Sequence, residues 1–231
     1  MKTLARSTVL AVLALSSGSA VHAQDRVRLQ ERLAASTAVL RQIAGVPDRG
    51  IPVNIAHKAR CVMVVPSFKK GAFLVGAEYG QGVATCYVAH KGWSAPAFIR
   101  MSGVSFGFQA GGQGTDLVLV GVTRESGNKL LSEKIKLGGD VAVAAGPVGR
   151  NSKAEAGILA NAGFLTYSRA KGIFAGVDLS GDEVNNNGKD TVTFYGKDLT
   201  HQKILNGAVS TPAAAKPFIR EVTRVFGGTA R

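Results

Sequence analysis

The chain has 231 residues, of which 45% are hydrophobic and 19% charged, a balance typical of a globular protein rather than a disordered one. Its 29 glycines follow no three-residue period, which excludes a collagen-like structure and predicts glycines in turns, bulges and close backbone contacts. The formal charge of +13 attracts phosphates on lipids, lipopolysaccharide or nucleic acid, unless it serves solubility alone.

The first 23 residues have the three-part layout of a secretory signal peptide. Lys2 and Arg6 supply a positive start, an apolar stretch follows over residues 9–15, and Val21-His22-Ala23 provides a cleavage site. The apolar stretch is shorter than the roughly 20 residues that span a bilayer. We therefore expect an exported protein, periplasmic or secreted and peripheral at the membrane, for which nucleic acid is the least expected partner. The alternative is an ordinary amphipathic N-terminal helix.

Two helices are predicted next along the chain. Leu29, Leu33, Leu40 and Ile43 recur at helical spacing and predict an amphipathic helix over residues 25–43. A second, short helix is expected to begin at Pro52, because proline is favoured at the first helical position.

Strand signals follow in the middle of the chain. The apolar run over 61–65 predicts a buried strand that Pro66 ends, and Lys69-Lys70-Gly71 predicts a turn. Two more strands are expected over 72–79 and 82–88, around Gly80-Gln81-Gly82. Further strands are predicted over 103–111, where bulky and small residues alternate, and over 116–122, 140–145, 164–167 and 173–179.

The remaining segments of the second half are short. A helical turn is expected over 128–134, a basic turn over 168–172, a polar loop over 181–190 and a short helix over 200–206. A last helix is expected from Pro217 to the Gly227-Gly228 stop. This order predicts one α+β domain over 24–231, with a mainly antiparallel, glycine-rich, barrel-like sheet flanked by N-terminal and C-terminal helices.

The two cysteines, Cys61 and Cys86, are an even number in an oxidising compartment, so we expect one disulfide between them. The alternative is two buried free thiols, because both residues lie in apolar stretches. Neither cysteine has a neighbouring His or Cys, so we expect no metal site. The sequence also lacks a phosphate-binding glycine loop, and we expect no cofactor.

Ser105 lies in a G-x-S-x-G pattern, the nucleophile elbow of serine hydrolases. That chemistry requires a strand-to-helix turn at the serine, with a later acid and base such as Asp178 or Asp182 and His201. The alternation around Ser105 predicts an uninterrupted strand instead. A serine hydrolase is therefore the least favoured interpretation, and we expect no catalytic residues.

Basic residues gather in the predicted turns beside glycine. Lysine and arginine in such turns reach phosphate oxygens, while apolar neighbours meet acyl chains. For any single residue the alternative is an ordinary solvated charge. The resulting candidates for lipid binding are Lys69, Lys70, Arg150, Arg169 and Lys171.

One block of the sequence is more specific than the rest, the run Tyr167-Ser168-Arg169-x-Lys171-Gly172-Ile173-Phe174-Ala175-Gly176. With Lys70-Gly71-Ala72-Phe73-Leu74-Val75-Gly76 and Trp93-Ser94-Ala95-Pro96-Ala97-Phe98, it resembles the SYLF lipid-binding domain family. The similarity extends from about residue 30 to 207.

This resemblance implies a phospholipid-binding module without catalytic activity. Eukaryotic members of the family bind phosphoinositides, and fungal members also engage actin. For an exported chain, the resemblance implies a partner that is an anionic phospholipid or membrane surface. The first helix would then lie at the membrane interface, unless its leucines pack on the sheet. The alternative function is a structural or interaction protein of the cell envelope that recognises a protein or glycan.

Overall fold

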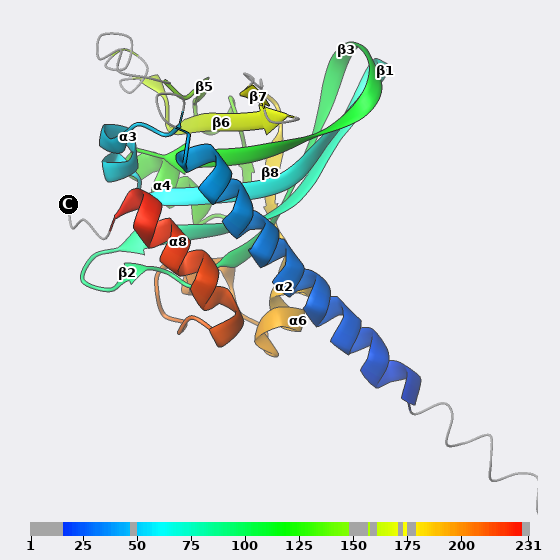
Figure 1. Cartoon of the computed structure of the whole chain (residues 1–231), viewed down its shortest axis with the longest axis vertical. Helices are drawn as coiled ribbons and strands as arrows, with labels where there is room; N and C mark the ends of the chain where they lie inside the picture. The colour runs from blue at the N-terminus through cyan, green and yellow to red at the C-terminus, as the bar shows by residue number, and fades with distance from the viewer. Residues whose placement is uncertain are drawn as a thin grey trace, which may run out of the picture.

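The protein folds as a curled, mostly antiparallel sheet with helices across its outer face (Figure 1). The computed structural model describes residues 16–46, 50–147, 157, 161–170, 173–174 and 179–227. Helix α2 (Ser16–Ala44) and helix α8 (Lys216–Phe226) lie side by side on the sheet. The predicted α+β class, with helices from both ends of the chain flanking the sheet, is confirmed.

Two long strands dominate the sheet. β1 (Cys61–Val88) and β3 (Ala97–Gly121) pair antiparallel from Cys61 opposite Gly121 to Ala84 opposite Ala97. The sheet order is β2-β1-β3-β6-β5, with β5 parallel to β6 and the other neighbours on this path antiparallel. The shorter strands are β2 (Gly92–Trp93), β4 (Lys134–Lys136), β5 (Val143–Ala145), β6 (Phe164–Ala170), β7 (Ile173–Phe174) and β8 (Glu183–Asn186).

Two turns expected from the sequence are wrong, because strand β1 continues through them. Lys69-Lys70-Gly71 and Gly80-Gln81-Gly82 both lie within β1, which replaces three expected strands. The register shifts between Val65 and Phe68 and again between Lys70 and Ala72. Such bulges bend a strand without ending it, and they accommodate a proline or glycine that would otherwise interrupt the pairing. The reversal expected over 168–172 is confirmed but tighter, because β6 continues to Ala170 and pairs antiparallel with β7, with Ala170 opposite Ile173; residues 171–172 lie outside the described residues.

Strand β1 curls back until its two halves touch. A Cβ atom on Gly82 would lie 2.1 Å from the Val64 carbonyl oxygen, and one on Gly80 would lie 2.6 Å from Val65 Cγ1. Near the ends of the strand, the Tyr87 amide donates to the Arg60 carbonyl oxygen at 2.7 Å. These glycines therefore serve a close approach of one half of β1 to the other, and not a turn.

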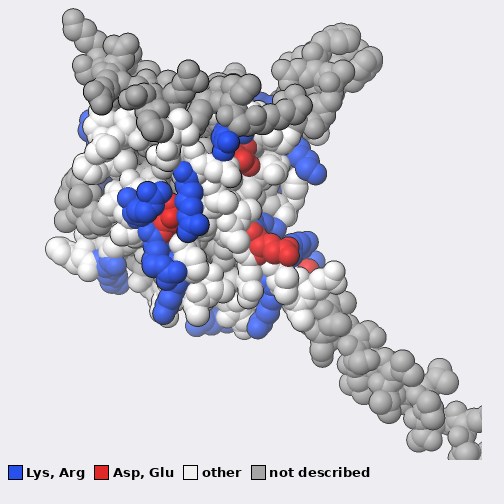
Figure 2. Space-filling model, viewed as in Figure 1, with Lys and Arg blue, Asp and Glu red and all other residues white. Residues whose placement is uncertain are grey.

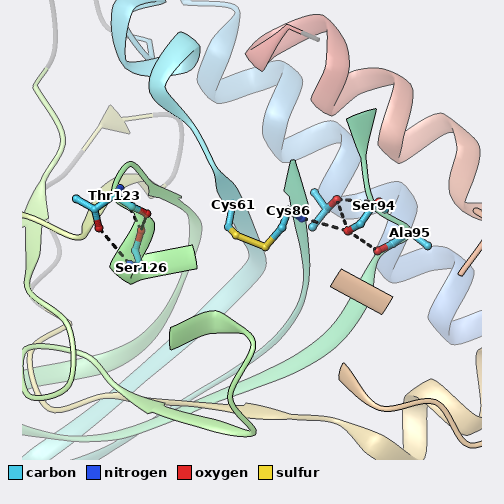
Figure 3. The surroundings of a disulfide bond; sticks show 7 residues. Cys61, Cys86, Ser94, Ala95, Thr123 and Ser126 are labelled. Atoms are coloured by element: carbon cyan, nitrogen blue, oxygen red, sulfur yellow. Dashed lines mark hydrogen bonds between the residues drawn. A yellow bond between two sulfur atoms is a disulfide. The ribbon is translucent and has the colours of Figure 1, made fainter. Parts of the chain in front are cut away.

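The expected disulfide is confirmed, and it joins the two ends of β1 (Figure 3). Cys61 and Cys86 are bonded with an S–S distance of 2.02 Å and are separated by 25 residues. On one side, the Cys86 amide donates to Ser94 Oγ, at 3.2 Å. On the other side lies the capping box of helix α4 (Arg124–Leu130), formed between Thr123 and Ser126.

Alternation along the strands divides the interior into two cores. Met63, Val65 and Phe68 belong to the inner core, which the curled sheet surrounds. Val62 and Val64 face the outer core, where helices α2 and α8 cover the sheet. Leu29, Leu33 and Leu40 of α2 are at most 2% exposed and belong to this outer core. The leucine face of the first helix therefore packs on the sheet and does not lie at a membrane interface.

Helix α2 begins at Ser16, earlier than the expected start at Asp25, and ends at Ala44. None of the described helices is long and apolar enough to cross a bilayer. The shorter helical segments are α3 (Val53–Lys58), α6 (Gly188–Tyr195), α7 (His201–Leu205) and the 3-10 turn η1 (Ala213–Ala215).

The polar loop expected over 181–190 is wrong, because this segment forms β8 and the start of α6. Val184 is buried at 3% exposure and pairs with Met101 of β3, which anchors β8 in the sheet. Asn187 caps α6 by accepting the Asp190 amide at 3.3 Å. Strand pairing with β3 and β4, a buried valine and a helix cap thus order a mostly polar segment.

Candidate functional site

Lys69 and Lys70, neighbours in the predicted basic turn, point to opposite faces of β1. Lys69 is exposed on the outer face, beside α2. Lys70 points to the inner face, where its Nζ lies 2.9 Å from Glu78 Oε1 and 6.0 Å from the centre of the Phe68 ring. The Glu78 side chain is only 4% exposed, so Lys70 neutralises a buried carboxylate.

Arg169 lies on β6, opposite Asp116 of β3. Its Nη1 donates to Gln42 Oε1 of α2 at 2.7 Å. The Arg169 side chain therefore lies on the helix-covered face of the sheet, the same face as Lys69. The other two predicted lipid-binding residues, Arg150 and Lys171, lie outside the described residues. Among the predicted set, the structure therefore brings Lys69 and Arg169 to one face and turns Lys70 away from it.

A groove of about 380 Å³ opens between α2 and β1, and we refer to it as the α2 groove. Residues from one side of the helix form one wall, and two separate stretches of the curled strand form the other. Its lining residues are Arg28, Glu31, Arg32 and Ala35 from α2, with Pro66, Ser67, Lys69, Tyr79, Gly80 and Gln81 from β1.

Arg32 fixes the buried side of the α2 groove. Its Nη1 lies 2.5 Å from Asp190 Oδ2, its Nη2 donates to Gln81 Oε1, and its guanidinium stands 5.7 Å from the Phe98 ring centre. The Arg32 and Asp190 side chains are 8% and 6% exposed, so this is a buried ion pair that ties α2 to α6 and β1. Arg32 thus shapes the groove and holds no charge free for a ligand.

Arg28 and Lys69 are the accessible cations of the groove. The Arg28 side chain is 55% exposed, and its Nη2 lies 3.2 Å from Asp25 Oδ1 and 3.8 Å from Asp190 Oδ1. Lys69 is exposed and forms no ion pair with any residue that the structure describes. Ion pairs at such exposure are weak, so both side chains are able to exchange their present partners for an anionic ligand. Glu31 is the acidic residue of the groove lining.

One exposed aromatic side chain lines the groove with these cations, and an exposed valine lies farther along the same face of the ribbon. Tyr79 is 43% exposed and lines the groove, and Val104 is 63% exposed on β3. Tyr79 pairs with Ser102, and Ala77 pairs with Val104, so all four residues share the outer face of the ribbon. A tyrosine and an aliphatic side chain beside arginine and lysine suit a boundary between water and an apolar phase.

A second charged cluster joins α2 to α8 further along the helix. Figure 2 shows basic side chains gathered around an acidic one where the two helices lie side by side. Glu221 accepts from Arg41 Nε at 3.0 Å and from Arg224 Nη2 at 2.5 Å. Burial raises the pKa of Glu221, but the hydrogen bonds from Arg224 and Arg41 together lower it more, so the pKa lies below its usual range. This cluster holds the two helices together.

Ser105 and His201, two of the residues considered for catalysis, show no catalytic geometry, and Asp178 lies outside the described residues. The backbone at Ser105 is strand, paired with Gly76, and the strand continues to Gly121, so no strand-to-helix turn forms there. His201 is 8% exposed, and burial lowers its pKa from 6.5 to about 4, with a hydrogen bond to the Leu130 backbone opposing the shift. Within the described ranges, no three His, Cys, Asp or Glu residues converge as metal ligands would.

Sequence reasoning missed Arg28 and Tyr79 as site residues. Arg28 lies in the helix predicted over 25–43 and Tyr79 ends the strand predicted over 72–79, so neither lies in a predicted basic turn. The spacing of Arg28 and Arg32 at i and i+4 was the available signal, because it places two guanidiniums one above the other on one side of a helix. No local signal brings Tyr79 next to them, since that contact depends on the curl of β1.

Comparisons with known proteins match most of the chain. The family described as Ysc84, Las17-binding protein actin regulator, matches residues 102–225. LAS seventeen-binding protein 3 of Saccharomyces cerevisiae is 34% identical over 193 residues, or 82% of this chain and 41% of the relative. SH3 domain-containing YSC84-like protein 1 of Homo sapiens is 33% identical over 171 residues, or 74% of this chain and 50% of the relative.

Protein YSC84 of Saccharomyces cerevisiae is 34% identical over 187 residues, or 79% of this chain and 40% of the relative. The chain spans half or less of the length of these three relatives. The resemblance seen in the sequence is thereby confirmed, and the chain belongs to the Ysc84, or SYLF, family.

Proposed function

We propose that the chain is a non-catalytic phospholipid-binding protein of the cell envelope, which docks on anionic headgroups through the α2 groove. The observation that carries the proposal is the position of Arg28 and Lys69, both accessible, beside the exposed Tyr79, with the exposed Val104 on the same face of the ribbon as Tyr79. Cations beside exposed apolar side chains match the two layers of a membrane surface, phosphate outside and hydrocarbon beneath.

In this proposal, headgroup phosphate oxygens accept hydrogen bonds from Arg28 and Lys69. The Tyr79 ring and Val104 meet the glycerol and upper acyl region, and the buried Arg32 keeps α2 at a fixed distance from β1. Glu31 also lines the groove and repels a phosphate placed next to it, so the headgroup is expected at Arg28 and Lys69 and away from Glu31. The curled sheet then acts as a rigid support, and no bond of the lipid is broken.

The proposal selects among the residues predicted from sequence. It keeps Lys69 and leaves out Lys70, whose ammonium neutralises the buried Glu78. Arg169 is retained as a flanking contact on the same face, and Arg150 and Lys171 stay as predictions.

Vesicle co-sedimentation tests this function. The purified chain should bind vesicles rich in anionic phospholipid at low salt, bind neutral vesicles weakly, and dissociate as salt rises. The variant Arg28→Gln/Lys69→Gln should bind anionic vesicles about tenfold or more weakly, because a basic residue near the surface contributes about 1 kcal/mol.

The matched control is Lys203→Gln/Arg220→Gln, which removes the same charge from exposed positions on α7 and α8. If control and groove variants lose binding equally, net charge rather than the groove drives association. If the unsubstituted chain ignores anionic vesicles, the proposed function is wrong.

The envelope location rests on the predicted signal peptide and needs its own test. Expression with fractionation, followed by mass spectrometry of the exported chain, should give Gln24 as the first residue. A chain that retains Met1–Ala23 in the cytoplasmic fraction would remove the envelope from the proposal.

A protein partner is the second candidate function. Its support comes from the relatives, because LAS seventeen-binding protein 3 is named for binding another protein. Pull-down from envelope extracts treated to remove lipid separates the two candidates, since a protein partner is captured without lipid and a lipid-dependent one is not.

A further inference from the structure

A second cavity, of about 350 Å³, lies at the disulfide-bonded end of the curled ribbon, and we refer to it as the disulfide pocket. It is formed where the two ends of β1 meet α4 and the end of α7. Its lining residues are Arg60, Cys61, Cys86, Tyr87, Val88, Ala89, Arg124, Gly127, Asn128, Leu131, Leu205 and Asn206.

The charged groups of this pocket are all positive. Arg60 is half-buried, Arg124 is exposed, and none of the described residues of the lining is acidic. Neither arginine forms an ion pair with the residues that the structure describes. The amides of Asn128 and Asn206 add neutral donors. Guanidiniums bind carboxylate and phosphate through paired N–H groups, so two of them without a carboxylate partner favour an anion.

The backbone around Arg60 is held on both sides. The Arg60 amide donates to the Gly121 carbonyl oxygen at 2.8 Å, and its own carbonyl oxygen accepts from the Tyr87 amide at 2.7 Å. The next residue, Cys61, is covalently joined to Cys86. A binding site that is already ordered loses little conformational entropy when a ligand enters, which raises the affinity of each contact.

The α4 wall is equally fixed at its start. The Ser126 amide donates to Thr123 Oγ1 at 3.1 Å, and the Thr123 amide donates to Ser126 Oγ at 3.2 Å (Figure 3). Gly127, the next residue, lies close to the disulfide, since a Cβ atom there would lie 3.8 Å from Cys61 Sγ.

Part of the pocket is apolar. Val88, Leu131 and Leu205 belong to its lining, together with the two bonded cysteines. A volume near 350 Å³ is at the lower end of the range for small-molecule sites, roughly 300–1,000 Å³. The lining thus matches a ligand with a charged end and a short apolar part.

We propose that the disulfide pocket binds a small organic anion, with Arg60 and Arg124 on its phosphate or carboxylate oxygens and its apolar part against Leu131 and Leu205. The site is independent of the α2 groove, which uses a different stretch of β1 and other basic residues. Free metabolites and the headgroups of lipids share this chemistry, so the test distinguishes the two sources.

Isothermal titration of the whole chain with hexyl phosphate, inorganic phosphate and hexanol tests the proposal. Hexyl phosphate should bind more tightly than inorganic phosphate, because it also fills the apolar part, and hexanol should not bind measurably. Arg60→Gln and Arg124→Gln should each weaken hexyl phosphate about tenfold, and Arg220→Gln should leave it unchanged. Circular dichroism before titration establishes that each variant is folded.

Hexyl phosphate that fails to bind the folded chain at millimolar concentration overturns the proposal. So does binding that Arg60→Gln and Arg124→Gln both leave unchanged. Competition with phosphatidic acid vesicles identifies the source: displacement assigns a lipid headgroup, and no displacement assigns a soluble anion. The variant Arg28→Gln/Lys69→Gln should keep full hexyl phosphate binding, so this site and the proposed function fail separately.

Discussion

The α2 groove and the disulfide pocket both lie along β1 and both offer two accessible basic side chains, but their surroundings differ. The groove is lined by the exposed Tyr79, with Val104 on the same face of the ribbon, and includes the acidic Glu31. The pocket has no acidic residue among the described residues of its lining and is bounded by the Cys61–Cys86 bond. Similar charges therefore suit different ligands: an extended surface at the groove, and a small molecule at the pocket.

Both sites depend on the curl of β1. The largest loss of stability is therefore expected from a substitution where the two halves of β1 approach most closely. Gly82→Ala places a Cβ atom 2.1 Å from the Val64 carbonyl oxygen, a contact that the backbone of the other half of β1 must move to relieve. We expect a loss of about 4 kcal/mol in the free energy of unfolding, measured by urea denaturation.

Gly127→Ala is the matched control for that substitution. Its Cβ atom would lie 3.8 Å from Cys61 Sγ, an ordinary contact, and alanine favours a helix by about 1 kcal/mol over glycine. Equal effects of the two substitutions would show that the close approach at Gly82 does not limit the fold.

The second largest effect is expected from removal of the disulfide, which should impair ligand binding at the pocket but not at the groove. Cys61→Ser/Cys86→Ser frees a loop of 25 residues in the unfolded chain and should lower the free energy of unfolding by about 3.5 kcal/mol. The folded fraction should lose binding of hexyl phosphate yet keep binding of anionic vesicles, because the groove lies at the middle of β1. Loss of vesicle binding by a variant that circular dichroism shows to be folded would contradict this separation.

His201 should make the pocket end of the molecule sensitive to acid. Its pKa is about 4 in the folded protein, lowered by burial from the 6.5 of an exposed histidine. Between pH 6.5 and pH 4 the unfolded chain therefore binds a proton that the folded chain does not. The free energy of unfolding should fall by about 3 kcal/mol across that window and change no further from this group below it.

Urea denaturation at intervals from pH 7 to pH 4 measures this dependence. His201→Gln should remove it, whereas substitution of the exposed His57 by Gln should preserve it. An unchanged pH profile in His201→Gln would assign the acid sensitivity to another group.

The smallest effect is expected at Arg169, which lies beside the groove but outside its lining. Its exposed hydrogen bond to Gln42 should contribute less than about 1 kcal/mol to stability, so Arg169→Gln should fold normally. Its vesicle binding should fall about twofold to fivefold, less than in Arg28→Gln/Lys69→Gln. A loss larger than that of the groove variant, measured by co-sedimentation, would move the centre of the lipid site towards β6.

The features that the sequence predicted correctly are local ones. Periodicity in 25–43 predicted the first helix, and alternation across Ser105 predicted a strand rather than a nucleophile elbow. The disulfide followed from cysteine number and compartment. These features depend on residues close together in the sequence, or on a simple count.

The turns that were predicted wrongly depend on contacts between residues far apart in the sequence. Pro66, Gly71 and Gly80 are local signals for turns, but the curl of β1 uses them at bulges and at close approaches between its halves. The bulge between Val65 and Phe68 also changes which side chains point inward. Simple alternation from Val65 would turn Lys69 inward, whereas the bulge turns Lys70 inward, to Glu78.

The most direct test measures two double variants, one at each site, against both ligands. Arg28→Gln/Lys69→Gln and Arg60→Gln/Arg124→Gln, which remove equal charge, are each measured against anionic vesicles and against hexyl phosphate. We expect the first variant to lose vesicles and keep hexyl phosphate, and the second to lose hexyl phosphate and keep the vesicle binding that the α2 groove provides. If both variants weaken both ligands to the same extent, overall charge governs binding, and neither site is what its geometry indicates.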